Sequence, residues 1–354
     1  MTEPLRFAIV GSGMIAQIHA RALADLGDAA RLRVVVGRNA SAREALAARY
    51  GAVATDDLVA VLRDAEIDAV IDCGPSGARA ELAVAALRAG KHVVLEKPMA
   101  LTLSDADKII AVERESDRRV AVISQHRFDH SVRRVAAAIR AGRLGTVTSV
   151  IASCAWWRGQ SYYDSAAWRG TWKMDGGGAA MNQGIHVIDL MVFLLGRPTE
   201  VFAYTGLLAH QRVEVEDIAV AVVKLPGGAL GVIHATTAAY PGLDVSLRLY
   251  GARGSAVITD DELEFLHENL GAAPEIKPGG RTDLNQVTEE DRLPIRPTPL
   301  GPAHRAQLAD FIDAVRTGRP PSVGSADGRA SLSVVLGMYE SARTGRPVFL
   351  NEQS

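Results

Sequence analysis

Short apolar runs alternate with amphipathic stretches through the first third of the chain. The apolar runs, which we expect to be strands, are residues 5–10, 32–36, 69–72, 93–95 and 120–124. The stretches between them, which we expect to be helices, are residues 15–26, 41–50, 57–63, 78–89 and 104–115. Strands that are separated by single helices form a parallel sheet with helices on both faces. The pattern therefore predicts a doubly wound Rossmann domain over residues 1–124.

The pattern changes after residue 124. Beyond a helix expected over 131–141, it predicts strands at 147–156, 200–208, 218–225, 229–237, 244–250 and 255–259. Glycines at 227–228 and 251–254 predict hairpin turns between such strands. Three more helices are expected at 180–195, 303–316 and 327–343, and the last two can pack back near the first domain. Residues 267–300, rich in Gly, Pro and charge, predict a long surface segment. We therefore expect an α+β domain over 125–354 with a mainly antiparallel sheet.

The composition excludes several classes of partner. The net charge is -2, from 39 basic and 41 acidic residues without a long block of one sign, so neither nucleic acid nor an anionic membrane is expected as a partner. No apolar leader or run of membrane-spanning length is present, which predicts a cytoplasmic protein. The two cysteines, Cys73 and Cys154, are too few and too far apart for a disulfide framework or a cysteine metal site.

A glycine-rich turn follows the first strand directly. Its sequence is Gly11-Ser12-Gly13-Met14-Ile15-Ala16. In the dinucleotide-binding fingerprint, Gly11 would make the tight turn, Gly13 would let the backbone approach a pyrophosphate, and Ala16 would allow close helix packing. The amino terminus of the following helix supplies free N–H groups for phosphates. Because the motif lies between a clear strand and a clear helix, it predicts a dinucleotide site.

The end of the second strand bears on the choice of cofactor. An Asp or Glu at this point binds the ribose 2′-hydroxyl of NAD, whereas a small residue followed by Arg suits the 2′-phosphate of NADP. The sequence here is Gly37-Arg38-Asn39-Ala40-Ser41, which contains no acid. NADP is therefore favoured, although Asn39 could also bond a free 2′-hydroxyl, which leaves NAD as the alternative.

The stretch around the fifth strand places a charged pair at the sheet edge. A buried apolar strand over 93–95 leads directly into Glu96, Lys97 and Pro98. Ligands of open α/β sheets bind at the carboxyl ends of the strands. Proline fixes φ, so these residues form a sharp turn, with a cis Lys97–Pro98 bond as one form, that would aim Lys97 across the edge. The alternative is a surface lysine that happens to follow a strand.

Two further segments carry candidate chemistry. Tyr162, Tyr163, Trp168, Arg169 and Trp172 form an aromatic segment that suits a sugar ring, or that packs a domain junction instead. Asn182 and His186 are four residues apart, so they share one face of the helix that three glycines introduce. Imidazole titrates near neutral pH, which makes His186 a candidate acid or base, although many helical histidines are structural.

These residues resemble the Gfo/Idh/MocA oxidoreductase family. The features that carry the resemblance are the Gly11 turn, then Ala89-Gly90-Lys91-His92-Val93 leading to Glu96-Lys97-Pro98, and Gly176-Gly177-Gly178 leading to Asn182 and His186. The resemblance implies that Lys97 lies beside the nicotinamide, that His186 is catalytic, and that the second sheet is open and contributes to a homodimer or homotetramer. Two departures are present: Gly74-Pro75-Ser76 and Arg79 replace a Thr-Pro followed by Asn and His, and Asn182 replaces an aspartate.

A mechanism follows from the charges. His186 would take the hydroxyl proton, Lys97 would stabilise the developing alkoxide, and Asn182 would orient His186 or the substrate. Cofactor contacts are expected from Gly11, Ser12, Gly13, Met14, Ile15, Arg38, Asn39, Ser41, Pro75, Glu96, Lys97 and Arg169. Substrate contacts are expected from Lys97, Arg127, Tyr163, Trp168, Asn182 and His186. No metal is expected, because His126 and His130 lack an evident third ligand.

The function expected is hydride transfer between NADP or NAD and a hydroxyl or keto group of a sugar, cyclitol or sugar derivative. A glycoside hydrolase that uses tightly bound NAD for transient oxidation and elimination is one alternative. A sugar or nucleotide sensor without catalysis is another, against which Lys97 and His186 argue.

Overall fold

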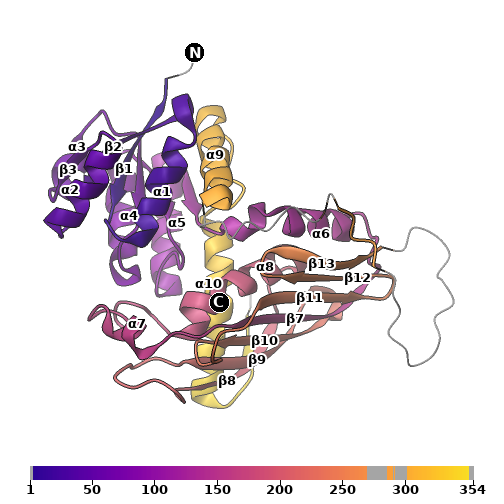
Figure 1. Cartoon of the computed structure of the whole chain (residues 1–354). Coiled ribbons are helices and arrows are strands. Elements are labelled where there is room, and N and C mark those ends of the chain that lie inside the picture. The colour runs from indigo at the N-terminus through magenta and orange to yellow at the C-terminus, as the bar shows by residue number, and fades with distance from the viewer. Residues whose placement is uncertain (1–2, 269–284, 290, 292–300, 351–354) are drawn as a thin grey trace. The chain divides into compact units, whose positions relative to one another are not determined.

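The computed structural model describes residues 3–268, 285–289, 291 and 301–350 (Figure 1). The chain divides into two compact units. The first comprises Met1–Gln125, Lys173–Gly176 and Pro297–Leu332, and the second comprises His126–Trp172, Gly177–Arg296 and Ser333–Ser354. None of the described helices is long and apolar enough to cross a membrane.

The first unit contains a six-stranded parallel sheet with the order β3-β2-β1-β4-β5-β6. Its strands are β1 (Leu5–Val10), β2 (Ala30–Val36), β3 (Val53–Thr55), β4 (Ala69–Asp72), β5 (His92–Leu95) and β6 (Val120–Val122). The helices that follow them are α1 (Met14–Ala24), α2 (Ala40–Arg49), α3 (Leu58–Arg63), α4 (Arg79–Arg88) and α5 (Leu103–Ser116). The predicted Rossmann fold is confirmed. The strand order reverses between β1 and β4, and ligands of such sheets bind at this point.

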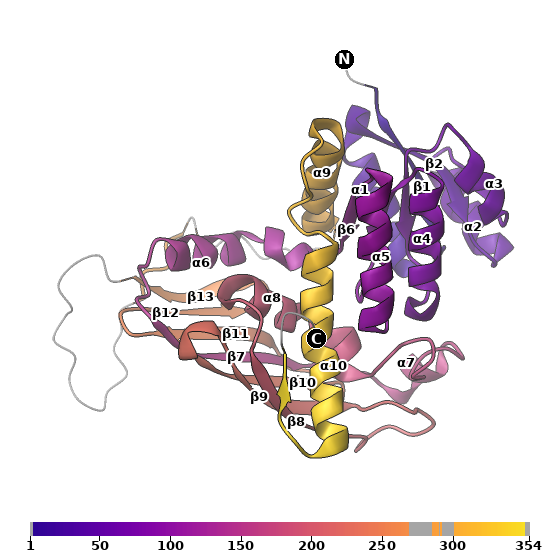
Figure 2. The ribbon, with the colours of Figure 1, turned by 180° about the vertical axis from the view of Figure 1, so that it is seen from behind.

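Helices cover both faces of this sheet (Figures 1 and 2). Phe7 and Ile9 of β1 pack in one core with α1, α2 and α9 (Gly301–Thr317), while Ala8 of the same strand packs on the opposite face with Val61 of α3. Phe311 of α9 lies with its ring centroid 6.3 Å from that of Phe7. The helix α9, distant in sequence, is therefore part of the core of the first unit.

The second unit contains an eight-stranded sheet with the order β13-β12-β11-β7-β10-β9-β8-β14. The strands are β7 (Val147–Ala155), β8 (Glu200–Gly206), β9 (Ile218–Lys224), β10 (Leu230–Thr236), β11 (Val245–Gly251), β12 (Ser255–Thr259), β13 (Glu262–His267) and β14 (Val348–Phe349). The pair of β7 and β10 is parallel and the other pairs are antiparallel. The mainly antiparallel sheet is confirmed, and the two edge strands β13 and β14 are additions to the prediction.

One face of this sheet packs against helices and the other is exposed. The helices are α6 (His130–Arg140), α8 (Ile185–Leu195) and the second half of α10 (Ser325–Thr344), whose Ser341 hydroxyl accepts a hydrogen bond from the backbone of Ala203 in β8. Residues of β9 alternate strictly between buried and exposed positions. Several exposed positions of the sheet are nevertheless apolar, among them Tyr204, Val220, Val222, Leu230 and Val232.

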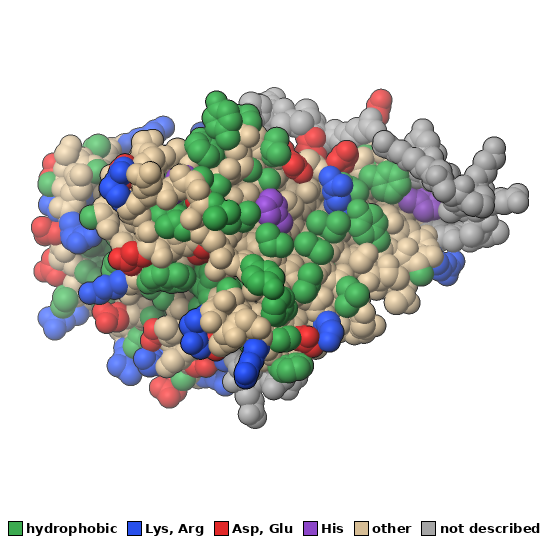
Figure 3. Space-filling model, turned by 90° about the horizontal axis from the view of Figure 1, so that it is seen from below, with side chains coloured by type: hydrophobic (Ala, Val, Ile, Leu, Met, Phe, Trp, Pro, Cys, Tyr) green, Lys and Arg blue, Asp and Glu red, His purple; other side chains and the backbone are tan. Residues whose placement is uncertain are grey.

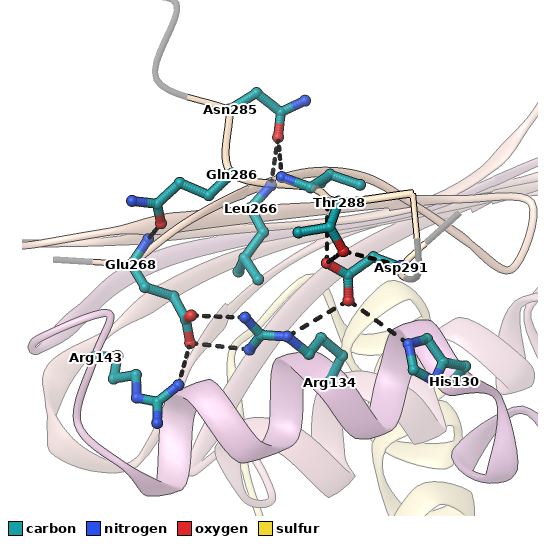
Figure 4. A network of polar contacts seen from close by, with 10 residues as sticks. His130, Arg134, Arg143, Leu266, Glu268, Asn285, Gln286, Thr288 and Asp291 are labelled. Carbon is teal, nitrogen blue, oxygen red and sulfur yellow. Dashed lines mark hydrogen bonds and ion pairs between the residues drawn. The ribbon is translucent and has the colours of Figure 1, made fainter. Parts of the chain in front are cut away.

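The predicted surface segment over 267–300 lies mostly outside the described residues. Its described part runs along the edge strand β13 (Figure 4). The backbone of Gln286 donates to Leu266 at 2.7 Å, and its side-chain oxygen accepts from the backbone of Glu268 at 2.6 Å. Glu268 in turn accepts from Arg134 of α6 at 2.7 Å. These contacts cover the backbone of an otherwise open sheet edge.

Candidate active site

The glycine turn is built as a phosphate-binding turn requires. Gly11 has φ +120°, and a Cβ there would lie 2.8 Å from the carbonyl oxygen of Cys73, so the position needs glycine. Gly13 is the N-cap of α1, and a Cβ there would meet nothing within 4 Å. No side chain caps this helix, and Met14 in its first turn is 74% exposed. The backbone N–H groups of the first turn, with Ser12 and Ile15 beside them, can therefore receive an anion.

Beyond β2, the structure places Arg38, Asn39 and Ser41 on the surface. Asn39 is the N-cap of α2, and its side-chain oxygen accepts a hydrogen bond from the backbone of Ala42 at 3.1 Å. That oxygen is therefore engaged, and the amide N–H₂ group is what remains for a ribose. Arg38 is exposed at this strand end, where the guanidinium of Arg43 in α2 also donates to the carbonyl oxygen of Gly37 at 2.8 Å.

Glu96 lies buried at the carboxyl end of β5. Its carboxylate accepts a hydrogen bond of 2.8 Å from Nε2 of His19 in α1, and Nε2 of His304 in α9 lies 3.9 Å away. Burial raises the pKa of Glu96, but the hydrogen bond from His19 and the positive charges of His19, His304 and Lys97 outweigh it and lower the pKa to about 2. The residue that follows is Lys97, and the Lys97–Pro98 bond is cis. An ionised carboxylate therefore fixes the turn that carries the lysine.

Arg79 has a structural role that the sequence did not indicate. Its buried guanidinium bonds Asp72 at 2.9 Å and the carbonyl oxygen of Gly74 at 2.9 Å, and also contacts the carbonyl oxygen of Pro98. It thereby ties the turn after β4, which contains Pro75, to the turn after β5. An arginine in the first turn of a helix is ordinarily solvated, so pattern alone could not reveal this ion pair.

In the second unit, a buried carboxylate holds the segment that precedes His186. Glu216 accepts hydrogen bonds of 2.9 Å from the backbone N–H groups of Gly178 and Ala180, and one of 2.8 Å from the hydroxyl of Tyr339. Burial raises the pKa of Glu216, although these bonds act in the opposite direction. A Cβ on Gly178 would lie 1.7 Å from the backbone oxygen of Glu216, so this close approach requires glycine. No sequence pattern pointed to Glu216, which lies 38 positions beyond Gly178.

The helix expected over 180–195 is not regular. It begins with a π-helical turn, Ala180–Gly184, and continues as α8. Asn182 lies in the π turn and its side-chain amide donates to the carbonyl oxygen of Gly177 at 3.0 Å, while His186 lies in the first turn of α8. The prediction of a regular α-helix is therefore wrong over residues 180–184, whereas the shared face of Asn182 and His186 stays a prediction. Single π turns inside helices occur frequently at functional sites.

The ring of His186 contacts that of His126. Their centroids lie 5.3 Å apart and the ring planes are nearly perpendicular, at 89°. Nδ1 of His126 lies 3.0 Å from Asp129 and 2.8 Å from Asp261. Burial lowers the pKa of His126, but the bonds to these two carboxylates outweigh it and raise the pKa to about 10. The carboxylates thus favour the protonated ring, and Asp129 and Asp261 supply, within 4.8 Å, the further ligand atoms that the sequence did not reveal beside His126.

His130, considered with His126 as a possible metal ligand, points to a different group. Its Nε2 lies 3.6 Å from Asp291, within the network of Arg134 and Glu268 (Figure 4). His19, Glu96 and His304 also have ligand atoms within 4.8 Å of one another, but the contact of His19 with Glu96 is a hydrogen bond within a buried core.

The aromatic segment is organised around two arginines. The guanidinium of Arg169 lies over the rings of Tyr162 at 4.4 Å and Trp168 at 4.6 Å, and that of Arg158 lies over Tyr162 at 5.1 Å and Trp156 at 5.0 Å. Neither arginine has an ion pair with a carboxylate among the described residues, and the Nε atom of each is buried without a hydrogen-bond partner there. This array, Trp156, Arg158, Tyr162, Trp168 and Arg169, presents two positive charges against aromatic faces.

Two other residues expected to contact the substrate are engaged internally. The buried guanidinium of Arg127 binds Asp189 of α8 in a bidentate pair, at 2.8 Å and 2.7 Å. Tyr163 is buried with its hydroxyl 2.8 Å from that of Thr237, and burial raises the pKa of Tyr163 to about 12. These contacts favour a supporting role for both side chains, and their contact with a substrate stays a prediction.

Comparisons with known proteins cover both units. Residues 5–124 match a family model described as an oxidoreductase family with an NAD-binding Rossmann fold, and residues 132–257 match a GFO/IDH/MocA C-terminal domain. The chain is 27% identical to myo-inositol 2-dehydrogenase of Thermotoga maritima, over 98% of this chain and 99% of that protein.

Among solved structures, the WlbA dehydrogenase from Bordetella pertussis, in complex with NADH and UDP-GlcNAcA, is 32% identical. The match has a TM-score of 0.87 and covers 99% of each chain. The WlbA dehydrogenase from Chromobacterium violaceum, also in complex with NADH and UDP-GlcNAcA, is 31% identical with a TM-score of 0.88, over 99% of this chain and 97% of that one.

Proposed function

Because the chain belongs to the Gfo/Idh/MocA oxidoreductase family, we propose that it transfers hydride between NADP or NAD and a hydroxyl or keto group of a sugar, cyclitol or sugar derivative. The observation that carries this proposal is the position of Lys97. It follows the buried Glu96 at the carboxyl end of β5, in the same parallel sheet as β1, whose carboxyl end leads into the Gly11 turn. A cation and a phosphate-binding turn at one sheet edge suit hydride transfer beside a dinucleotide.

Several features of the first unit fit the dinucleotide. The pyrophosphate and its ribose would lie against the amino terminus of α1. This terminus is uncapped, has open space at Gly13 and exposes Met14. Exposed Arg38, with no acid at the end of β2, favours the 2′-phosphate of NADP over the free hydroxyl of NAD. When bound, the nicotinamide accepts or returns the hydride.

The protein side chains manage the proton and the charge. His186 takes the proton of the reacting hydroxyl, or returns it in the reducing direction, and Lys97 stabilises the negative charge on the oxygen. Asn182 is neutral and its amide donates to Gly177, so it supports the geometry of the π turn and can offer its carbonyl oxygen to a neighbour. Neither a sensor nor a binding protein needs this combination of acid, base and cation.

Within the substrate class, we favour sugars that carry negative charge. The array of Arg158 and Arg169 leaves two cations without carboxylate partners among the described residues. Arg169 suits a phosphate of the cofactor, and Arg158 suits an anionic group of the substrate, with Trp168 available to the apolar face of the sugar ring. The WlbA dehydrogenases, 32% and 31% identical, were crystallised with a UDP-linked sugar, whose diphosphate is such an anion.

We also propose that the chain forms a homodimer or homotetramer through the open face of the second sheet. Figure 3 shows hydrophobic side chains across one face of the molecule. Tyr204, Val222 and Leu230 on exposed positions of β8, β9 and β10 are 69%, 54% and 58% exposed. Contiguous apolar surface of this kind marks protein interfaces. Light scattering at several protein concentrations would test this assembly, and a strict monomer would refute it.

The function is tested by the absorbance of reduced nicotinamide in the presence of NADP or NAD and a panel of inositols, free sugars and UDP-linked sugars. Reduction that depends on one substrate class supports the proposal and identifies the cofactor. Release of sugar from an aryl glycoside, without net reduction of added cofactor, would instead support the hydrolase alternative. Binding of a sugar with no turnover in either direction would support the sensor.

A further inference from the structure

The contact between His126 and His186 has a consequence for the proposed base. We propose that His126 is a positioning residue that keeps His186 in its neutral, proton-accepting form, because the two touching rings hold one positive charge and Asp129 and Asp261 fix that charge on His126. This inference rests on the role of His186 in the proposed function. It assigns a role to a residue that takes no part in the proposed hydride transfer itself.

Two separate elements are arranged around His126 to hold its charge. Asp129 occupies the N-cap position of α6, yet its side chain makes no capping bond and is directed to His126 instead. Asp261 belongs to the turn between β12 and β13, where Asp260 and Asp261 both have positive φ, 47° and 70°. Side chains other than glycine adopt this conformation at a cost.

The turn is held against α6 despite this backbone cost. The hydroxyl of Ser131 donates to the backbone oxygen of Asp261 at 2.6 Å, and the Asp261 carboxylate reaches His126 at 2.8 Å. The turn is therefore fixed at two points, as a positioning role for the Asp261 carboxylate requires. The bonds to both carboxylates raise the pKa of His126 to about 10, so the ring is charged at neutral pH.

Two other charged groups near α8, among the residues that the structure describes, are engaged by partners. Arg127 and Asp189 neutralise each other one turn beyond His186, and Glu216 is bound by backbone N–H groups before the π turn. Asp261 is 54% exposed, so solvent screens much of its charge. Strand β7 has no Asp, Glu, Lys, Arg or His, and Arg248 of β11 is exposed.

A second positive charge on the His186 ring is therefore disfavoured by direct contact with the first. Interacting sites of this kind titrate as a pair, and the proton stays on the ring that has the acidic partners. At a centroid distance of 5.3 Å, the charge on one ring acts directly on the other, so the contact opposes protonation of His186. Asn182, which is neutral, does not oppose this effect as the aspartate of inositol dehydrogenases would.

The test is a histidine-selective NMR titration of the intact protein without substrate, with the His186 signal identified from His186→Gln. We expect His126 to remain protonated through neutral pH and His186 to titrate below the ordinary histidine value. In His126→Gln the midpoint of His186 should rise to higher pH. The control is His130→Gln, which removes a half-exposed histidine from α6 and should leave His186 unchanged.

The outcomes separate this inference from the proposed function. A neutral His126 at neutral pH in the unaltered protein would overturn the inference, even if His126→Gln failed to fold. So would an unchanged His186 midpoint in a folded His126→Gln protein. Retained turnover in His186→Gln would instead overturn the catalytic role of His186, whatever the titration shows. If His126 positions the proton and His186 is the base, the acid limb of kcat/KM for oxidation should move to higher pH in His126→Gln. The size of this move should equal the change in the NMR midpoint of His186.

Discussion

The carboxylate of Glu96 accepts a 2.8 Å hydrogen bond from His19, a residue 77 positions earlier in the chain. This contact joins α1, which begins at the glycine turn, to the residue that precedes Lys97. One hydrogen bond therefore connects the helix that follows the glycine turn to the residue that precedes Lys97, the proposed catalytic lysine, within the first unit.

Glu96 should make the unfolding free energy of the protein depend on pH. Its pKa is about 2 in the folded chain, against an ordinary value of 4.5. Its contribution to the unfolding free energy is therefore complete above pH 4.5 and is lost as the pH falls toward 2. The shift corresponds to about 3 kcal/mol. Between pH 4.5 and pH 2, the unfolding free energy of Glu96→Gln should therefore fall by about 3 kcal/mol less than that of the unaltered protein. Urea unfolding at several pH values measures it, and an identical acid dependence in both proteins would contradict the pairing.

Two glycines of the same turn should respond differently to alanine. Gly11→Ala should lower the unfolding free energy by about 1–3 kcal/mol, because of its positive φ and the contact with Cys73. Gly13→Ala should change it by less than about 0.5 kcal/mol, since nothing lies near the added Cβ, and yet should weaken dinucleotide binding. Thermal unfolding and fluorescence titration with NADPH separate the two effects. Full NADPH affinity in Gly13→Ala would place the pyrophosphate elsewhere.

Arg38→Asp should reverse the cofactor preference. This change removes a cation from the end of β2 and adds an acid there. It should weaken NADP binding by at least about tenfold and favour NAD, because the acid repels a 2′-phosphate and can bind the free hydroxyl. Arg31→Asp is a suitable control, since Arg31 is also exposed but lies near the start of the same strand. Equal loss of NADP and NAD affinity would show that Arg38 does not select the cofactor.

Glu216→Ala should disturb the segment that carries Asn182 and His186. It leaves the buried N–H groups of Gly178 and Ala180 without their acceptor, at a cost of about 1–3 kcal/mol for each group. Tyr339→Phe removes a single bond to the same carboxylate and should cost about 1 kcal/mol. Chemical unfolding and turnover measured on both variants test this order. A Glu216→Ala protein as stable and active as Tyr339→Phe would rule out the anchoring role.

Local patterns predicted the elements of the fold and the motifs of the site. Strands such as β4 and β5 are short apolar runs, and the Gly11 turn and the Glu96-Lys97-Pro98 turn are contiguous in sequence. The role of each turn could be inferred from the sequence because it depends only on residues that are adjacent in the chain.

The supporting contacts could not be predicted in this way. Arg127 and Asp189 are 62 positions apart, and Glu216 lies 38 positions beyond Gly178. From the sequence alone, each of these charged residues could equally lie on the solvated surface or in a buried pair. The π turn at Ala180–Gly184 was also missed, because a helical periodicity does not reveal one wider turn.

The most direct test of the central claim is turnover in Lys97→Ala, measured as the substrate-dependent formation of reduced nicotinamide with dinucleotide binding measured in parallel. The control is Lys108→Ala, which removes an exposed lysine of α5 that pairs with Asp105. We predict that Lys97→Ala still binds the dinucleotide and loses at least about a hundredfold in kcat, as removal of a group that stabilises transition-state charge should cause. Turnover equal to that of Lys108→Ala would show that Lys97 does not stabilise the charge on the reacting oxygen.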